Sequence, residues 1–572
     1  MEMPVASGES VATQPEDVPQ LPNHKVKVKK LGQRACNEKN DKGKFCGGHL
    51  KRWFYATDVL EKECGCAEKA WGPNAEVYRC EFCQTLYLPN AEDPRDLNVG
   101  GVGQLSIFGL TIIPKKRRKK KRKCSSRFAA GLTARAAGCG LRKFAERPLH
   151  AGCPSLHDMK TTDLIYDWNR QYPQSLRPPG PVLLTDETLR DGLQSPSVRD
   201  PSIEQKIEIL HLMEALGINS LDLGLPGSGP RAVEHVTALA REIVAHKMKI
   251  RPYCAARTHE KDIRPIAEIV QKTGLAIEVA AFLGSSPIRR YTEGWSNDFL
   301  LETTERAVKY AVSLGLEVMY TTEDTTRCDP ETIKQLNTTA IRCGARAIVL
   351  CDTAGHATPM GTVALVKFVV DEVIKPTGET IRLDWHGHCD RGLATANAMA
   401  ALVAGANCVH ATALGIGERV GNTQMDQMLV NLKLMGIAPW DNQDLTKLKA
   451  YCEAVSMATG VPIPANYPVV GDDAFRTATG VHASAVIKAY KKNDVELANT
   501  VYSGVPSHVF GLEQVIDIGP MSGKSNVHFW LEHRGFPVDE DVVERIYKLA
   551  KASDHTLSEA EIMECVPSHK PA

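Results

Sequence analysis

The sequence lacks any apolar run long enough to cross a membrane, since no stretch of about 18 consecutive apolar residues occurs in it. Its first residues, MEMPVASGESVATQPEDVPQLP, contain no apolar segment of the kind that a secretory signal peptide needs. We therefore expect a cytoplasmic protein with no membrane partner, and we interpret residues 1–30 as a disordered tail. In a reducing compartment the 17 cysteines are expected to be thiols or metal ligands rather than disulfides.

An excess of charge of either sign is also missing. The 69 basic and 68 acidic residues give a net charge of +1, so the chain as a whole shows no electrostatic footprint for nucleic acid. One local exception is the run of nine basic residues from Lys115 to Lys123. It lies in residues 96–158, which we interpret as a basic low-complexity linker, with contact to nucleic acid as the alternative. Met159 looks like a natural protein start, which raises the hypothesis that residues 1–158 are a read-through fusion.

Residues 31–95 are rich in cysteine and resemble a small zinc ribbon, because tetrahedral zinc takes four Cys or His ligands from two turns. The pair Cys80-x-x-Cys83 lies between two strand-like pieces, and Cys46-x-x-His49 supplies a second pair. We predict a structural zinc ion at these four residues, with free thiols as the alternative. The ligand set stays open because the segment contains three more cysteines: Cys36, Cys64 and Cys66.

The segment from 159 to 440 shows a regular alternation of short apolar runs and amphipathic helical stretches. Eight such units in about 250 residues predict an α/β fold, a TIM (β/α)8 barrel, which would be the catalytic domain. A doubly wound open sheet is the alternative, but no glycine-rich fingerprint follows the first apolar run. Residues 441–572 are predicted to form a helical or mixed C-terminal subdomain. The eight apolar runs begin at residues 182, 220, 251, 276, 317, 347, 381 and 408.

Polar side chains follow the predicted strands at the point where each strand ends. In a TIM barrel these ends meet at one mouth, where active sites are built. We therefore expect one site that gathers residues from all eight strands. The candidates, in chain order, are Arg190, Asp191, Gln194, Asp222, Arg257, His259, Ser285, Ser286, Glu323, Asp324, Asp352, Thr353, His386, His388, Glu418, Arg419 and Asn422.

His386 and His388 stand two residues apart at the end of the seventh predicted strand. Side chains at this spacing point to the same side of a strand. Two imidazoles on one face, joined by a carboxylate from another strand, are typical of a divalent-metal site. Asp191 is the predicted carboxylate ligand, and Asn422 offers a further oxygen. His410, inside the eighth strand, is interpreted as a structural histidine.

Seven stretches carry a resemblance to a known family: DETLRDGLQSP, SSPIRRY, TTEDTTRCDP, CDTAGHATP, DWHGHCDRGLATANA, GIGERVGNTQ and TGVHASAVIK. By these stretches, residues from about 180 to 530 resemble the DRE-TIM metallolyase superfamily. Within it they are similar to the Claisen-condensing branch of 2-isopropylmalate, homocitrate and citramalate synthases. The resemblance implies an acyltransferase that joins acetyl-CoA to a 2-oxo acid, with a divalent metal (Mg, Mn or Zn), and a homodimer.

The resemblance also implies roles for single residues. Asp191, His386 and His388 would hold the metal, with Asn422 near it, and Arg190 would stabilise the developing alkoxide. Glu323 and His482 would take part in the proton transfer that forms the acetyl-CoA enolate. Thr353 would bind the substrate carboxylate. Further candidates for substrate binding are Gln194, Ser286 and Arg257.

The sequence lacks two features that other branches of this family carry. At two places it also differs from the usual isopropylmalate synthase pattern, so the identity of the 2-oxo acid stays open. The loop LGIGERVGN contains no cysteine of the kind that the lyase branch uses, and no biotin-accepting lysine motif is evident. Ala280 and Ala281 stand where isopropylmalate synthases usually carry His-Thr, and Arg289 is suited to a second carboxylate. We expect 2-oxoisovalerate and leucine biosynthesis, with 2-oxoglutarate or pyruvate as alternatives and no leucine inhibition. A zinc-dependent nucleic-acid-binding protein is the alternative from another class.

Overall fold

A computed structural model describes residues 25–30, 33, 35–39, 43–46, 50–53, 77–80, 83–88, 106–107, 110–111, 164–171 and 177–567. The chain divides into two compact units, residues 1–140 and residues 141–572. His49, Cys64, Cys66, Lys115–Lys123 and Met159 lie outside the described residues, so the predictions made for them stay predictions. No described helix has the length and apolar character needed to cross a membrane.

The N-terminal unit contains a four-stranded sheet of very short strands. Its order is β1-β4-β3-β2, in which β1 pairs parallel with β4 and the other neighbours are antiparallel. Among its described residues, the buried apolar side chains are Val26, Cys36, Tyr78, Cys80, Leu86 and Tyr87. The strands of the unit are β1 (Val26–Val28), β2 (Leu50–Trp53), β3 (Val77–Cys80), β4 (Leu86–Leu88) and a separate pair, β5 (Ser106–Ile107) and β6 (Leu110–Thr111).

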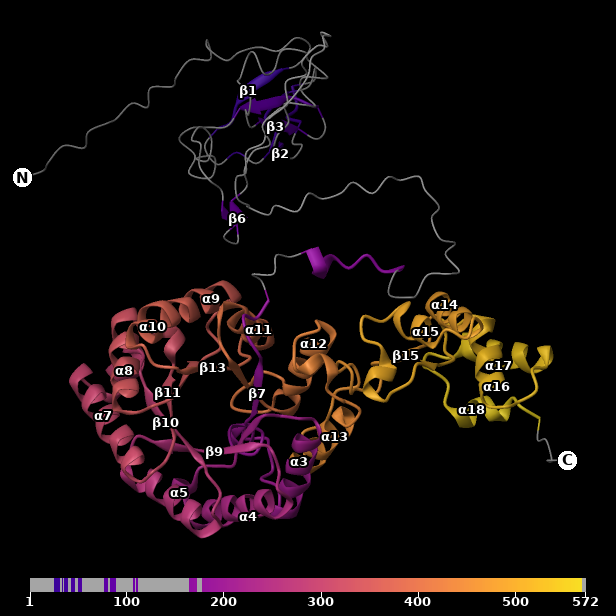
Figure 1. The fold of residues 1–572 in the computed structure, drawn as a ribbon. Coiled ribbons are helices and arrows are strands. Elements are labelled where there is room, and N and C mark those ends of the chain that lie inside the picture. The colour runs from indigo at the N-terminus through magenta and orange to yellow at the C-terminus, as the bar shows by residue number, and fades with distance from the viewer. Residues whose placement is uncertain are drawn as a thin grey trace, which may run out of the picture. The chain divides into compact units, whose positions relative to one another are not determined.

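The second unit contains a closed barrel of eight parallel strands, each of which falls on one of the predicted apolar runs (Figure 1). The predicted TIM barrel is therefore confirmed. The barrel closes where the last strand pairs with the first, His410 with Thr185 and Ala411 with Asp186. The strands are β7 (Leu183–Asp186), β8 (Ser220–Asp222), β9 (Arg251–Arg257), β10 (Glu278–Gly284), β11 (Val318–Glu323), β12 (Ala347–Asp352), β13 (Arg382–Gly387) and β14 (Cys408–Ala411).

Helices surround the barrel, and several begin at a side chain that satisfies free backbone N–H groups. Ser202 forms a capping box with Gln205, and Ser296, Asp329 and Thr358 cap later helices. The helices are α3 (Ile203–Ala215), α4 (Pro230–His246), α5 (Glu260–Thr273), α6 (Pro287–Glu293), α7 (Asn297–Ser313), α8 (Pro330–Cys343), α9 (Pro359–Phe368), α10 (Lys375–Thr377), α11 (Ala394–Ala404), α12 (Met425–Leu434) and α13 (Leu448–Thr459).

The barrel has two kinds of interior. Apolar residues of strands and helices form one large core between the two layers, which includes Leu184, Ile348 and Trp385. A second, smaller apolar cluster is formed by side chains of β9 to β12 and includes Tyr253, Met319 and Cys351. The large core extends through α13, where the Tyr451 hydroxyl donates to the Asp186 carboxylate.

The predicted C-terminal subdomain consists of helices and one very short strand pair, with apolar clusters of its own around Val486 and around Trp530. The strands β15 (Arg476–Thr477) and β16 (Val515–Ile516) pair in parallel. The helices are α14 (Gly480–Tyr490), α15 (Val495–Thr500), α16 (Lys524–His533), α17 (Glu540–Ala552) and α18 (Glu559–Glu564).

Candidate active site

The turn after β7 brings one guanidinium into contact with three carboxylates. Arg190 Nε donates to Asp222 Oδ2 at 2.6 Å, and its Nη1 donates to Asp191 Oδ1 at 2.7 Å. Its Nη2 lies 3.3 Å from Glu187 Oε1. Burial opposes the charge on Arg190, but the neighbouring carboxylates, Asp191 first, outweigh it and hold its pKa well above the usual value. The side chain is therefore a fixed cation at the mouth of the barrel.

Glu187 is the hub of the buried polar groups. It accepts hydrogen bonds from His386 Nδ1 at 2.7 Å, His410 Nδ1 at 2.9 Å and the Tyr253 hydroxyl at 2.8 Å. Burial alone would raise the pKa of Glu187, but the charges and hydrogen bonds of the two histidines hold it well below the usual value. An ionised Glu187 fixes the His386 proton on Nδ1 and leaves Nε2 to face the site.

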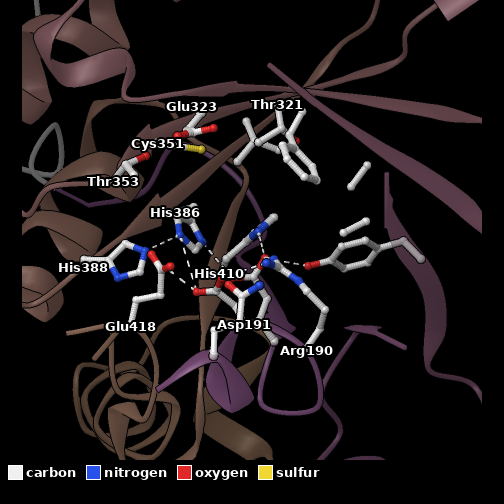
Figure 2. Close-up of a pocket in the computed structure, with 17 residues that line it drawn as sticks. Arg190, Asp191, Thr321, Glu323, Cys351, Thr353, His386, His388, His410 and Glu418 are labelled. Carbon is white, nitrogen blue, oxygen red and sulfur yellow. Dashed lines mark hydrogen bonds and ion pairs between the residues drawn. The ribbon is translucent and has the colours of Figure 1, made fainter. Parts of the chain in front are cut away.

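A group of one carboxylate and two imidazoles lies beside this hub (Figure 2). His386 Nε2 and His388 Nε2 are 3.0 Å apart, and Asp191 Oδ2 lies 3.9 Å and 3.8 Å from them. Burial, together with the charge of His386, lowers the pKa of His388 to about 4, so this ring is neutral and offers a lone pair. His388 Nδ1 and Asn422 Oδ1 are buried with no hydrogen-bond partner in the described part of the chain.

This donor set fits a divalent metal. One carboxylate oxygen and two imidazole nitrogens, all within 4.8 Å of one another, match the ligands that divalent transition metals take in catalytic sites. The partner of His386 is a buried carboxylate, which is the usual outer-shell arrangement of a ligating histidine. Asn422 Nδ2 donates to Asp191 Oδ2 at 2.5 Å and so orients the carboxylate.

The loop after β14 approaches these ligands closely because of its glycines. A Cβ atom on Gly417, whose φ is +152°, would lie 2.2 Å from Asn422 Oδ1. A Cβ on Gly421, whose φ is +95°, would lie 1.8 Å from the carbonyl oxygen of Gly415. Both positions therefore require glycine, and the stretch GIGERVGN serves to bring Asn422 against Asp191.

A cavity of about 260 Å³ opens at the carboxyl ends of the strands, over the metal-ligand group. Its lining combines charged side chains with small or apolar ones. The residues that line it are Glu187, Arg190, Asp191, Gln194, Tyr253, Ala255, Ala280, Phe282, Thr321, Glu323, Val349, Cys351, Thr353, His386, His388, His410 and Glu418.

Glu323 and Thr353, two of the residues predicted to act on the substrate or bind it, lie on the wall of the cavity opposite Arg190 (Figure 2). Burial raises the pKa of Glu323, and the opposing effect of Arg289 is smaller. The neighbouring Arg327 pairs with Asp324, Nη2 to Oδ2 at 2.7 Å. Thr353 Oγ1 accepts from the Asp324 backbone N–H at 2.9 Å, so its own hydroxyl proton is available to a ligand.

Three of the residues predicted to bind the substrate or act on it do not line this cavity. Ser286 is buried, caps α6 and donates to Asp324 Oδ2 at 2.5 Å. Arg257 pairs with Asp262 at 2.6 Å, and His482 is exposed on α14, where it stacks on Tyr502 with ring centroids 4.0 Å apart. Seven further candidates from the strand ends are also absent from its lining: Asp222, His259, Ser285, Asp324, Asp352, Arg419 and Asn422.

A second cavity, of about 570 Å³, adjoins the first and shares Phe282 and Glu323 with it. Exposed basic side chains gather along this cavity, while its wall contains Trp295 and Phe299. The basic residues are Arg257, His259, Lys261, Arg289 and Arg306. Arg289, which the sequence suggested for a second substrate carboxylate, lines this cavity and pairs with Glu293 at 3.2 Å.

Several residues of the site were given no role from the sequence. They are Glu187, Asp222, Tyr253, Glu418 and His410, the last interpreted only as structural. His410 was detectable in principle, because it pairs in register with His386 on the neighbouring strand and so faces the same side. Glu187 stands in the charged stretch after the first strand, but nothing in that stretch says which of its carboxylates binds the histidines.

Comparison with known proteins identifies the family of the chain. The model of the HMGL-like family matches residues 182–455. A homocitrate synthase from Methanopyrus kandleri is 32% identical over 376 residues, which cover 65% of this chain and 88% of that protein. A probable 2-isopropylmalate synthase from Ignicoccus hospitalis is 32% identical over 370 residues, 64% of this chain and 86% of that protein. A homocitrate synthase from Saccharolobus solfataricus is 30% identical over 386 residues, 66% of this chain and 76% of that protein.

Proposed function

The chain belongs to the HMGL-like family, in its Claisen-condensing branch, and from this premise we propose that it is a 2-isopropylmalate synthase of leucine biosynthesis. The reaction is the condensation of acetyl-CoA with 2-oxoisovalerate, followed by hydrolysis of the thioester. The single observation that carries the proposal is the cavity at the barrel mouth. It joins the Asp191, His386 and His388 group to a half-buried carboxylate, Glu323, on the other wall.

Asp191, His386 and His388 would hold the divalent metal, with Asn422 as a further ligand or as the group that orients Asp191. When bound, such a metal supplies Lewis-acid polarisation of a 2-oxo acid. Arg190 lines the same cavity, and its position is maintained by three carboxylates. A cation held in this way stabilises negative charge on the keto oxygen as that charge develops, with no cost of rearrangement.

Glu323 is the proposed general base. Its raised pKa makes it a stronger base than an exposed carboxylate. It removes one proton from the methyl group of acetyl-CoA, and the resulting enolate carbon forms a bond to the keto carbon of the oxo acid. The keto oxygen then takes up a proton and becomes a hydroxyl group. Water attacks the thioester carbonyl, the C–S bond breaks, and coenzyme A leaves as its thiol.

The second cavity suits the coenzyme A part of the donor. It shares Glu323 with the first cavity, so a thioester that lies across both presents its methyl group to this carboxylate. The phosphates of coenzyme A would meet the basic side chains along it, of which Arg306 and Lys261 are exposed. We expect Arg306→Gln to raise the KM for acetyl-CoA several-fold and to leave the KM for the oxo acid unchanged.

His482 would reach the site of a second copy of the chain. Within one chain it is absent from the lining of the cavity, and it is exposed on α14 beside Val481. Co-expression of His482→Ala with Arg190→Lys tests this proposal in a homodimer. Equal amounts of the two inactive chains should recover activity in about a quarter of the sites, because each mixed dimer then contains one intact site. Absence of any recovery would remove His482 from the partner's site.

The cavity wall favours 2-oxoisovalerate over an acidic oxo acid. The small or apolar side chains that line the cavity include Ala255, Ala280, Phe282 and Val349, which suit a branched apolar group. Arg190 is the only guanidinium among the residues that line the first cavity, and it already contacts three carboxylates. A second substrate carboxylate would therefore have no unpaired cation of that cavity to bind.

Release of free thiol from acetyl-CoA, measured with a panel of 2-oxo acids, tests the function. We expect kcat/KM with 2-oxoisovalerate to exceed that with pyruvate or 2-oxoglutarate at least about tenfold. Turnover should stop when a chelator is added and return with excess metal. Turnover only with 2-oxoglutarate would show that the proposed substrate is wrong and that the proposed condensation is right. No thiol release by metal-replete protein with any of the acids would overturn the condensation itself.

A further inference from the structure

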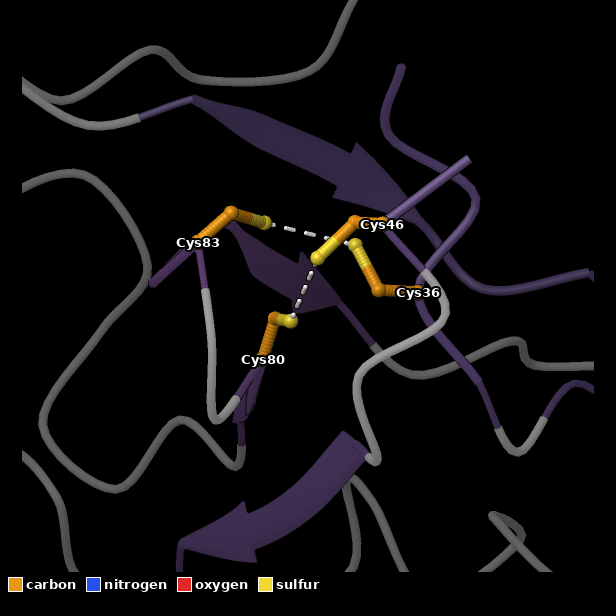
Figure 3. Close-up of side chains that lie close together, drawn as sticks. All are labelled: Cys36, Cys46, Cys80 and Cys83. Atoms are coloured by element: carbon orange, nitrogen blue, oxygen red, sulfur yellow. Dashed lines mark hydrogen bonds between the residues drawn. The ribbon is translucent and has the colours of Figure 1, made fainter. Parts of the chain in front are cut away.

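Four cysteine sulfurs of the N-terminal unit converge on one point (Figure 3). Cys36 Sγ and Cys83 Sγ are 3.5 Å apart, and Cys46 Sγ and Cys80 Sγ are 3.7 Å apart. All four sulfurs lie within 4.8 Å of one another. Three of these residues belong to the predicted ligand set, and Cys36 joins them, whereas His49 lies outside the described residues.

The spacing of the sulfurs is that of a tetrahedral metal site. Four ligands at the zinc–sulfur distance of about 2.3 Å, arranged as a tetrahedron, stand about 3.8 Å apart. The Cys36–Cys83 and Cys46–Cys80 sulfur distances are near this value. A disulfide, in contrast, needs about 2.05 Å between its sulfurs and would divide the four into two separate bonded pairs.

The surroundings of the sulfurs suit thiolates. The backbone N–H of Glu38 donates to Cys36 Sγ at 3.4 Å, and the Thr85 hydroxyl lies 3.1 Å from Cys83 Sγ. Hydrogen bonds of this kind stabilise the charged form of sulfur and orient it toward a metal. The turn between Cys80 and Thr85 is closed by two backbone bonds, from Gln84 N to the Cys80 carbonyl and from Cys80 N to the Thr85 carbonyl. Gln84 adopts a positive φ of 60° there, which lets the chain reverse within the turn.

The described part of the unit has a small buried core. Two of the four residues in its buried cluster, Cys36, Tyr78, Cys80 and Tyr87, are cysteines, and the other buried apolar residues are Val26 and Leu86. A sheet with strands of three or four residues buries too little apolar surface to be stable by itself. Small domains of this kind commonly fold only when they bind a metal, because the binding free energy then serves as folding free energy.

We propose that Cys36, Cys46, Cys80 and Cys83 bind one structural zinc ion, and that this ion folds the N-terminal unit. The site is independent of the barrel and of the reaction proposed for it. Four thiolates in tetrahedral arrangement select zinc or iron among common metals, and the hard-ligand metals Mg and Mn are excluded by the sulfur ligands. We assign zinc, which needs no redox partner.

The test measures zinc bound by the full chain in which the barrel ligands are removed by His386→Ala and His388→Ala. After reconstitution with zinc under reducing conditions and gel filtration, we expect about one zinc ion per chain. Adding Cys80→Ser and Cys83→Ser should lower this to less than about a tenth. X-ray absorption of the zinc-loaded chain should give four sulfur ligands at about 2.3 Å, a result that does not depend on how any cysteine variant folds.

Two controls make the assignment specific. Cys64→Ser with Cys66→Ser removes the rival cysteines that the sequence left open, and zinc should stay bound. Cys46→His exchanges one sulfur for a nitrogen, so zinc should also stay bound and the absorption spectrum should show three sulfurs. Unchanged zinc in the Cys80 and Cys83 variant, zinc lost with Cys64 and Cys66, or iron in place of zinc would each overturn the proposal. Two disulfides mapped by peptide mass spectrometry among Cys36, Cys46, Cys80 and Cys83 of the untreated protein would overturn it as well.

Discussion

The barrel and the N-terminal sheet both gather metal-binding side chains, but they do so in opposite ways. In the barrel, Asp191, His386 and His388 stand on a frame with a large apolar core, and Glu187 orients one histidine before any metal arrives. In the N-terminal sheet, Cys36 and Cys80 are themselves half of the small buried cluster. The barrel therefore preorganises its site, whereas the sheet depends on its site for its own order.

Removal of metal is the sharpest way to separate the two regions. Chelation should lower thiol release at least about a thousandfold, because Lewis-acid activation contributes several kcal/mol. The thermal unfolding of the barrel should move by only a few degrees, while the N-terminal unit should become sensitive to protease. Limited proteolysis with mass spectrometry, run beside the activity assay, measures both. Loss of the barrel fold on chelation would show that its site is not preorganised.

Arg190→Lys tests how much of the chemistry depends on the preorganised guanidinium. Lysine keeps the charge but loses the fork that contacts Asp191, Asp222 and Glu187 together. We expect kcat to fall about 100-fold with a smaller change in KM, as for the loss of a donor that acts on developing charge. Lys309→Arg, at an exposed pair on α7, is the matched control and should have wild-type kinetics.

Glu187→Gln should weaken the orientation of the metal-binding histidine His386 without removing a metal ligand. The amide cannot accept from His386, His410 and Tyr253 with the strength of a carboxylate, so His386 loses its fixed orientation. Metal affinity should fall about 10- to 100-fold, and excess metal should restore most of the activity. Glu305→Gln, on the exposed face of α7, serves as control. Unchanged affinity would mean that Glu187 does not orient the ligand.

Asp186 gives the barrel a pH dependence of stability. Burial raises the pKa of Asp186 to about 6, above the value of about 3.9 in an unfolded chain. The folded state therefore binds this proton more tightly, so the free energy of unfolding falls as the pH rises from about 4 to about 6. The contribution amounts to about 3 kcal/mol. Asp186→Asn should remove this part of the dependence of the free energy of unfolding on pH. Urea unfolding at several pH values measures it, and Asp371→Asn, at an exposed ion pair, is the control.

The smallest effect is expected from removing the N-terminal unit altogether. Because the chain divides into two compact units, a protein that begins at Met159 should retain kcat/KM within about twofold. Comparison of the two proteins in the thiol-release assay measures this. A truncated protein that folds but has no activity would mean that residues 1–158 take part in the reaction.

The order of the barrel strands and the residues at their ends could be predicted from the sequence. Alternation between buried strands and amphipathic helices is a local property, and polar residues stop an apolar run wherever the strand leaves the core. For this reason Arg190, Asp191, Glu323, His386 and His388 could be recognised before any coordinates were considered. The spacing of His386 and His388 needs only the period of a strand.

Which of these residues meet was decided by the tertiary structure. Glu187 and His410 stand 223 residues apart and bind only because β14 closes the barrel against β7. The same holds for Cys36, which meets Cys83 through the parallel pairing of β1 with β4. Register and closure are set by packing over the whole sheet, so no local pattern contains them. The sequence by itself determined the barrel and most of its chemistry, and the three-dimensional pairing of distant strands selected the partners.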